Sequence, residues 1–310
     1  MKKSFITSCI IVSSLYCINC FSKEPAKIVG LIPARNESHI IEQCLHALSL
    51  YTDAIVYLDD ASDDNSVEIV ESIAKKYHVE RIIKKKIWYR DEPGDKNALL
   101  KVGREIGGTH FIVIDADEMF TANCLDNNFL RNKIVALQPG DCLKFVWIQL
   151  WRSTQQYRFD NSIWTWNYKD FVFCDDKKCS YRSEFIHTRR TPILHGKTYT
   201  IQGYQYGMLH FQFVNWKNLL VKQAWYRCLE RVRAPKKSIS SINALYKPSK
   251  DEANLRLADA PIEWFIGYDF FDPTIFDLPD NWRKKQLNGW FNQYGKDYFK
   301  DLDIWDIDWQ

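Results

Sequence analysis

The stretch THFIVIDADEMF, residues 109–120, decides how the rest of the chain is interpreted. Four apolar residues, 111–114, lead directly into the acidic tetrapeptide Asp115-Ala116-Asp117-Glu118. A short uninterrupted apolar run is typical of a strand that is buried on both faces. Two carboxylates one residue apart at such a strand end can share Mg²⁺ or Mn²⁺, which in turn binds phosphate oxygens. The stretch therefore favours a metal-diphosphate site, the alternative being acids that only cap a strand and begin a turn.

The residues upstream repeat this arrangement of a strand followed by polar residues. Strands are predicted at residues 27–32, 54–58 and 80–84, and helical spacing of apolar residues predicts a helix after each of them, the third over about 96–106. Asn36 or Ser38 is expected to cap the first helix. Alternation with short connections predicts a Rossmann-like α/β fold, in which a mainly parallel sheet is flanked by helices on both faces.

Three strand ends of this predicted sheet carry polar clusters. They are PARNE at 33–37, DDASDD at 59–64 and DADE at 115–118. Because ligands of such sheets bind beyond the carboxyl ends of the strands, the three clusters are expected to meet at one edge. Three clusters at one edge favour a binding site over independent strand caps.

Composition limits the partners of the chain. It has 310 residues, 46% of them hydrophobic, which is enough for a sizeable core. Its formal net charge of +3 indicates no bulk electrostatic attraction to nucleic acid. Most of the twelve Trp residues follow position 140, where longer aromatic strands replace the alternating pattern. We expect a nucleotide-binding half at 23–140, an aromatic acceptor-side half of the same domain at 141–235 and a partly helical appendage at 236–310.

The N-terminal segment, 1–22, has Lys2 and Lys3 followed by an apolar run that is short for a membrane span. It predicts a signal peptide or an uncleaved signal anchor, and hence an exported or membrane-associated protein. Six cysteines lie beyond it. In an oxidising compartment Cys174 and Cys179 could close the loop CDDKKC, the alternative being buried thiols.

A late segment, residues 204–213 (YQYGMLHFQF), predicts a strand in which His210 lies on the face opposite the apolar side chains Leu209 and Phe211. Asn215 is expected to cap a helix that runs to about residue 233.

Together these motifs resemble the family 2 glycosyltransferases of the GT-A fold. The matching pieces are PARNE at 33–37, the DDxSxD-like run at 59–64, GDKNAL at 94–99 and the DxD element Asp115-Ala116-Asp117. Each motif alone is weak, but the four follow the family's order at suitable separations. The resemblance covers about residues 26–120 and extends less surely to His210.

The resemblance implies a UDP- or GDP-sugar donor and a divalent metal, Mn²⁺ or Mg²⁺. Asp115 would reach the ribose, or the metal through water, and Asp117 would ligate the metal directly. His210 would complete the metal shell, unless it is an ordinary structural histidine. The donor site implied in this way consists of Pro33, Ala34, Arg35, Asn36, Glu37, Asp59, Asp60, Lys96, Asp115 and Ala116.

The implied reaction is a single displacement with inversion, in which an acidic side chain takes the proton of the acceptor hydroxyl. The family often has an ED pair for this role, and the chain has no clean copy of it. Glu184 and Asp170 are the candidate bases, followed by Asp175 and Asp176, although each is otherwise an ordinary surface acid. The acceptor, whether glycan, lipid or protein, is not specified, and the N-terminal segment allows association with a membrane.

Two other interpretations compete with this one. An apolar strand ending in DxDE also resembles haloacid-dehalogenase-type phosphatases, in which the first Asp accepts a phosphoryl group. Those proteins carry the motif on their first strand, whereas here three predicted strands precede it. The other alternative is a carbohydrate-binding or degenerate transferase-like protein without activity.

Overall fold

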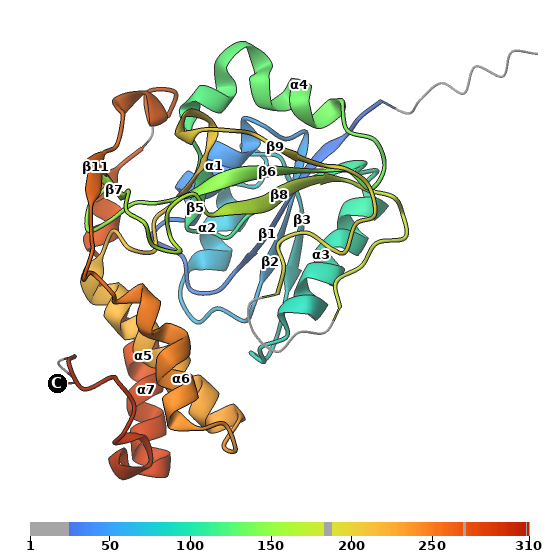
Figure 1. The fold of residues 1–310 in the computed structure, drawn as a ribbon. Helices are drawn as coiled ribbons and strands as arrows, with labels where there is room; N and C mark the ends of the chain where they lie inside the picture. The colour runs from blue at the N-terminus through green and yellow to red at the C-terminus, as the bar shows by residue number, and fades with distance from the viewer. Residues whose placement is uncertain (1–24, 183–187, 269–270, 308, 310) are drawn as a thin grey trace, which may run out of the picture.

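The computed structural model describes residues 25–182, 188–268, 271–307 and 309. Its centre is a nine-stranded sheet. Four parallel strands form one side of the sheet, in the order β3 (Val79–Lys84), β2 (Ala54–Asp59), β1 (Ile28–Ala34) and β4 (His110–Val113) (Figure 1). This is the Rossmann-like half that the sequence predicts.

The other side of the sheet contains antiparallel neighbours. Strand β8 (Tyr168–Cys174) runs antiparallel to both β4 and β6 (Cys142–Gln149). Beyond β6, the strand β10 (Met208–His210) is parallel to β6 and antiparallel to β5 (Glu118–Phe120), and β9 (Thr198–Thr200) also pairs with β6. The sheet is therefore continuous across residue 140, and the predicted α/β fold class, a mainly parallel sheet flanked by helices, is confirmed.

Helices cover both faces of the parallel strands. On β1, Ile28 and Ile32 pack into one core with α1 (Ile41–Ser49), whereas Val29 and Leu31 pack into a second core with α3 (Glu92–Glu105). Alternate residues of one strand thus reach opposite layers, as the pleat of a strand requires. The remaining helices of this region are α2 (Ser66–Ile73) and α4 (Phe129–Val135).

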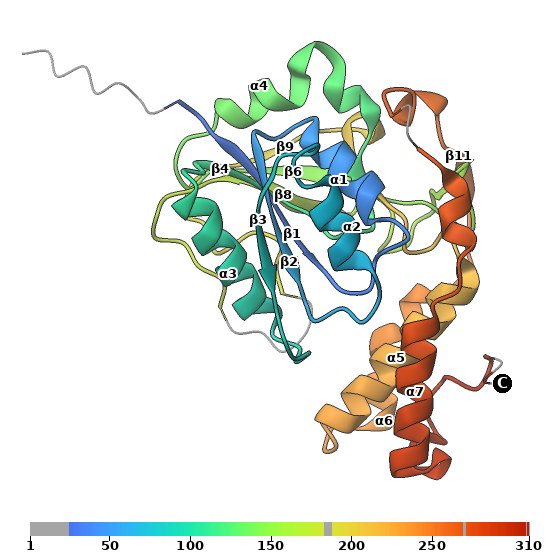
Figure 2. The ribbon, with the colours of Figure 1, turned by 180° about the vertical axis from the view of Figure 1, so that it is seen from behind.

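A helical layer follows the sheet in sequence and lies beside its lower edge in Figures 1 and 2. It contains α5 (Trp216–Arg233), α6 (Ile239–Tyr246) and α7 (Asn281–Tyr294), which share a core of their own. As expected, Asn215 caps α5, its side chain accepting a hydrogen bond from the amide of Asn218. A small sheet joins β7 (Gln156–Arg158) to β11 (Leu257–Asp259). Short 3-10 helices lie at Ala122–Asn128, Tyr204–Tyr206, Lys247–Ser249, Ile262–Trp264, Pro273–Asp277 and Lys296–Phe299.

Three local predictions are wrong. The strand expected at 204–213 is limited to β10, because the amide of Phe211 bonds to the carbonyl of Asp117 and the chain then turns. Helix α3 begins at Glu92, earlier than expected, because the Asp91 side chain caps it at Gly94. Neither Asn36 nor Ser38 caps α1, whose N-cap position is Ile40.

Within the described residues no disulfide joins Cys174 to Cys179, so the CDDKKC loop is not closed in this way. The expected leader at 1–22 lies outside the described residues. Within them, no helix has both the length and the apolar character that crossing a membrane requires.

Candidate functional site

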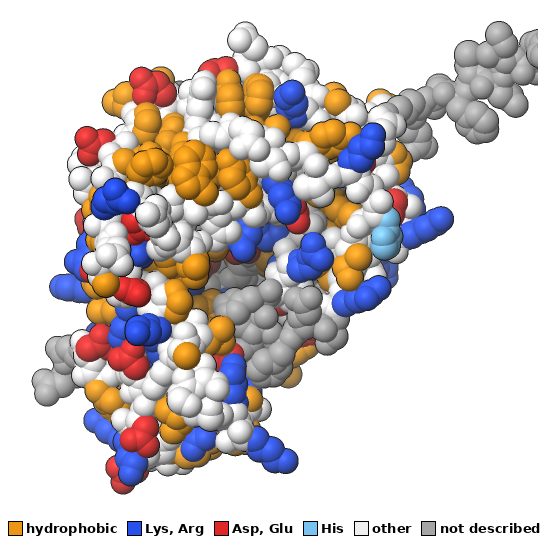
Figure 3. All heavy atoms as spheres, in the orientation of Figure 1, with side chains coloured by type: hydrophobic (Ala, Val, Ile, Leu, Met, Phe, Trp, Pro, Cys, Tyr) orange, Lys and Arg blue, Asp and Glu red, His pale blue; other side chains and the backbone are white. Residues whose placement is uncertain are grey.

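A cleft of about 790 Å³ opens beyond the carboxyl ends of β1, β2 and β4. The register of the sheet brings these ends together, since Ala34 pairs with Asp59 and Leu31 with Val113. The opposite wall belongs to the helical layer, and Figure 3 shows the surface hollowed between the two parts. The three polar clusters of the sequence therefore converge at one edge, as the alternation of strands and helices predicts.

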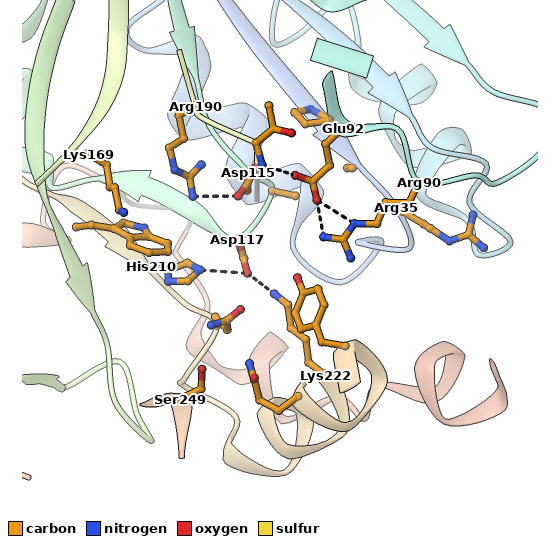
Figure 4. Close-up of a pocket in the computed structure, with 18 of the residues that line it drawn as sticks. Arg35, Arg90, Glu92, Asp115, Asp117, Lys169, Arg190, His210, Lys222 and Ser249 are labelled. Atoms are coloured by element: carbon orange, nitrogen blue, oxygen red, sulfur yellow. Dashed lines mark hydrogen bonds and ion pairs between the residues drawn. The ribbon is translucent and has the colours of Figure 1, made fainter. Parts of the chain in front are cut away.

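Asp117 lies in this cleft between two basic side chains (Figure 4). Its Oδ2 atom is 3.6 Å from Nε2 of His210 and 3.3 Å from Nζ of Lys222, which reaches it from α5. Burial alone would raise the pKa of Asp117, but the ammonium of Lys222 is the main cause that holds it well below its ordinary value. The carboxylate is therefore ionised and able to bind a cation.

His210 is oriented by a hydrogen bond on the far side of its ring. Its Nδ1 is 2.7 Å from Oε1 of Gln149, and the amide nitrogen of Gln149 donates to the carbonyl of Trp147. This second bond fixes the amide, so Oε1 accepts from Nδ1–H and the lone pair of Nε2 is directed at Asp117. Burial lowers the pKa of His210, which favours the neutral form that binds metals.

Arg190 links two further carboxylates of the acidic tetrapeptide. Its guanidinium is 3.0 Å from Asp115 and pairs with both oxygens of the buried Glu118. Glu118 also accepts hydrogen bonds from Nε1 of Trp147 at 2.7 Å and from the amide of Asp115 at 2.9 Å. Although burial alone would raise the pKa of Asp115, Arg190 and Lys96 keep it below its ordinary value.

The PARNE and DDASDD loops are locked together by side-chain hydrogen bonds. The amide group of Asn36 donates to Asp63 at 2.6 Å and accepts from the backbone amide of Asp63 at 2.8 Å. Asn36 has φ 54°, in the left-handed region that Asn tolerates better than most residues. Asp59 is buried and accepts from the amide of Ser62. Asn36 and Asp59 thus hold the loops, and neither lines the cleft.

The other residues of these loops face the cleft, namely Pro33, Ala34, Arg35, Glu37 and Asp60. Arg35 lies between the rings of Trp88 and Trp282, 5.3 Å from each ring centre. Asp60 is 2.5 Å from Nζ of Lys85. Glu37 lies between this cleft and a second cavity of about 480 Å³, where burial and the neighbouring Asp117 raise its pKa to about 8.

Lys96 also lines the cleft but is already engaged. Its Nζ donates to the carbonyls of Thr188 and Arg189 at 3.1 and 3.0 Å. Burial lowers its pKa. Ala116 lines the cleft between the two aspartates.

The four candidate bases have different positions. Asp170, on β8, lines the cleft with Lys144 at 3.7 Å, whereas Glu184 lies outside the described residues. Asp175 and Asp176 do not line the cleft: Arg104 pairs with the first, and backbone amides of residues 178 and 179 donate to the second. Together with Cys179 they form an acidic cluster compact enough for a metal, but Arg104, Lys177 and backbone amides already bind its oxygens.

Residues 31–128 match the model of glycosyl transferase family 2. Over these residues the chain is therefore similar to the family 2 glycosyltransferases. The matched residues are about a third of the 310. They include the PARNE and DDASDD loops, the DxD element and β1 except for its first three residues. No curated protein matches the chain.

Several solved structures are similar to parts of the chain. A mannosyltransferase from Pyrobaculum calidifontis, in complex with GDP-Man and Mn²⁺, shares 22% identity over 30% of this chain and 28% of its own, with a TM-score of 0.26. Residues 1–349 of S. aureus TarS align over 89% of this chain and 81% of theirs at 10% identity and a TM-score of 0.39. Glucosyl-3-phosphoglycerate synthase from Mycobacterium tuberculosis, in complex with Mn²⁺ and UDP-glucose, shares 24% identity over 30% of this chain and 34% of its own, with a TM-score of 0.23. The match therefore spans only about a third of the length of the mannosyltransferase and of the synthase.

Sequence reasoning missed four residues of the site, three in the cleft and one behind it. Lys222, Arg190 and Trp147 line the cleft, and Gln149 orients His210 from behind. Glu118 directly follows the DxD element, but nothing in its sequence position indicates that it anchors Arg190. A lone Lys or Arg carries no signal among 42 such residues, so these partners become visible only in three dimensions.

Proposed function

We propose that this chain is a glycosyltransferase that moves a sugar from a nucleoside-diphosphate sugar to an acceptor hydroxyl, with inversion at the anomeric carbon and with the help of a divalent metal. The observation that carries the proposal is the arrangement around Asp117. The carboxylate of Asp117 lies 3.6 Å from Nε2 of His210, whose ring Gln149 orients from behind, and Asp117 belongs to the part of the chain that matches the family 2 model.

The residues present fit a divalent metal. The Asp117 carboxylate and Nε2 of His210 face each other in the cleft, and Gln149 holds the imidazole in the tautomer that can ligate. Carboxylate and imidazole together suit Mn²⁺, and carboxylate alone suits Mg²⁺. When bound, the metal offsets the negative charge that develops on the leaving diphosphate.

Basic side chains of the chain itself supply further positive charge. Lys222 and Arg190 lie on either side of the two aspartates, at 3.3 Å from Asp117 and 3.0 Å from Asp115. Both cations line the cleft where a diphosphate beside Asp117 would lie, so they bind and orient its oxygens.

The donor and the acceptor bind at opposite ends of the cleft. The nucleoside binds near Arg35 and Asp60, between the PARNE loop and the aromatic side chains Trp88 and Trp282. The acceptor enters past Lys169 and Asp170 on β8. An acceptor oxygen forms the new bond to the anomeric carbon, the bond to the diphosphate breaks, and Asp170 or Glu184 takes the acceptor proton.

The test is release of nucleoside diphosphate. Protein lacking residues 1–22 is incubated with Mn²⁺ and a panel of UDP- and GDP-sugars, with Asp117→Ala as the site variant and Asp301→Ala, at an exposed acid, as the matched control. We expect release with at least one donor, lost by a factor of about 10² or more in Asp117→Ala and retained in Asp301→Ala. Release that persists without metal, or in Asp117→Ala, would overturn the mechanism. Donor binding without any release would show a carbohydrate-binding protein instead.

A further inference from the structure

Four aromatic side chains pack against one another outside the cleft, two of them exposed and two partly exposed. We define this aromatic platform as Tyr157, Phe159, Trp166 and Tyr204. The ring of Tyr204 lies 5.2 Å from Tyr157, 5.6 Å from Phe159 and 4.5 Å from Trp166. Phe159 and Trp166 are 42% and 51% exposed. Figure 3 shows hydrophobic side chains gathered on this face above the hollow, between β7 and β9.

The backbone conformation of Trp166 and two contacts fix the positions of the platform rings. Trp166 has φ 52°, a left-handed conformation that is strained for a bulky residue. Its amide donates to Oη of Tyr204 at 3.3 Å, and Tyr157 packs 5.0 Å from the buried ring of Trp264. Backbone strain of this kind clusters at functional sites, including those that hold ligands.

The platform continues the wall of the cleft. Asn167 and Tyr168 follow Trp166 directly and line the cleft, and so does Ile163, which is 65% exposed. Oη of Tyr168 donates to Gln202 at 3.1 Å, two residues before Tyr204. One surface therefore runs from Asp170, through Tyr168, to the platform.

We propose that the aromatic platform binds the sugar residues of an oligosaccharide acceptor that lie beyond the residue receiving the transferred sugar; this rests on the proposed function. Flat rings with polar rims match pyranoses, whose faces carry C–H groups and whose edges carry hydroxyls. The Oη groups of Tyr157 and Tyr204 and the indole N–H of Trp166 supply those rims. The four rings themselves carry no charge, so the surface is suited to a neutral saccharide rather than to an anionic one.

The length of the surface supports an oligosaccharide. A single sugar at Asp170 would be held by the cleft alone, whereas rings 4.5 to 5.6 Å apart beyond Tyr168 add contact only for sugars further along the chain. Exposed aromatic surface that is continuous with a binding cleft commonly marks a ligand site.

Trp166→Ala and Trp166→Phe test the platform, with Trp305→Ala as a matched control at a tryptophan that is 41% exposed elsewhere. The probes are monosaccharides and tetrasaccharides of β-linked glucose, α-linked mannose and β-linked N-acetylglucosamine, titrated by saturation-transfer NMR. We expect at least one tetrasaccharide to bind about tenfold more weakly to Trp166→Ala, with Trp166→Phe close to wild type and monosaccharide binding unchanged. Thermal melts confirm that each variant is folded.

The results that overturn the proposal are specific. If the tetrasaccharides bind Trp166→Ala as they bind wild type, or do not bind at all, the platform is not a saccharide site. Binding to phosphatidylglycerol vesicles that is lost in Trp166→Ala would assign the surface to a membrane instead. Hydrolysis of the donor by water needs the cleft but not the platform, so it separates the two proposals. If wild type lacks donor turnover but binds tetrasaccharides through Trp166, only the proposed function fails.

Discussion

Lys222 places its ammonium 3.3 Å from Oδ2 of Asp117, the carboxylate oxygen that also faces His210. The two residues come from opposite sides of the cleft, since Lys222 lies on α5 and Asp117 follows β4. The helical layer therefore supplies a cation at the place where the proposed metal would bind. In the proposed site, lysine and metal would compete for one oxygen, and a displaced lysine would lie close to the diphosphate of the donor.

Replacing Lys222 by Met should tighten the binding of Mn²⁺ in the absence of donor. If lysine occupies Asp117 in nine of ten molecules, its removal increases metal affinity about tenfold, because the competent fraction rises accordingly. The same variant should bind nucleoside diphosphate more weakly when Mn²⁺ is present. Both effects are measured by Mn²⁺ electron paramagnetic resonance and by calorimetry. Lys217→Met, at an exposed position of the same helix, is the control, and unchanged Mn²⁺ affinity in Lys222→Met would contradict the prediction.

Gln149 should control metal binding without contacting the metal. Its Oε1 accepts from Nδ1 of His210, so Gln149→Met releases the imidazole and permits the wrong tautomer. We expect Mn²⁺ affinity to fall about 10- to 100-fold, whereas Gln149→Glu, which keeps an acceptor at this place, retains most of it. Equal losses in the two variants would show that Gln149 acts only through packing.

Much of the donor side could be predicted from the sequence because its signals are local. A buried strand followed by acid, as at 111–118, needs only the pattern of apolar and charged residues, and the alternation of strands and helices places three such ends at one edge. Within those motifs, local sequence does not determine which residues face the cleft and which hold the loops together. Asn36 and Asp59 hold loops while Arg35 and Asp60 face the cleft, and this depends on which loop packs against which.

The second half resisted prediction for a different reason. Arg190, Lys222 and Gln149 come from three segments that meet only after the sheet and helical layer have packed, and none carries a spacing signal. The strand expected at 204–213 shows the same limit, because a hydrogen bond from Phe211 to Asp117, 94 positions away, ends it. Asp170 remains a predicted base that lies in the cleft.

Glu118 should be a main determinant of stability in the cleft floor. It is fully buried and accepts hydrogen bonds from Arg190, from Trp147 and from the amide of Asp115. Glu118→Ala leaves the guanidinium of Arg190 without its main partner, and removing one member of a buried ion pair costs about 3 to 5 kcal/mol. Urea unfolding measures the loss. The control is Glu263→Ala at an exposed acid, and the double variant Glu118→Ala/Arg190→Met should recover part of the loss. A loss below about 1 kcal/mol would contradict this role.

His210 predicts how stability depends on pH. Burial lowers its pKa below the ordinary value of 6.5, even though Asp117 acts in the opposite direction. Above pH 6.5 the residue is neutral in both folded and unfolded chains. As the pH falls through 6.5, the unfolded chain takes up a proton that the folded protein refuses, so the free energy of unfolding decreases.

The effect is isolated by comparing wild type with His210→Gln in urea unfolding at pH 7.5, 6.5 and 5.5. The variant lacks the titrating group, so the stability advantage of wild type over it should shrink as the pH is lowered below 6.5. An advantage that grows toward pH 5.5 would mean that the attraction of Asp117 exceeds the cost of burial. In that case His210 would be protonated in the folded protein, and its Nε2 would be a donor to Asp117 rather than a lone pair available to a metal.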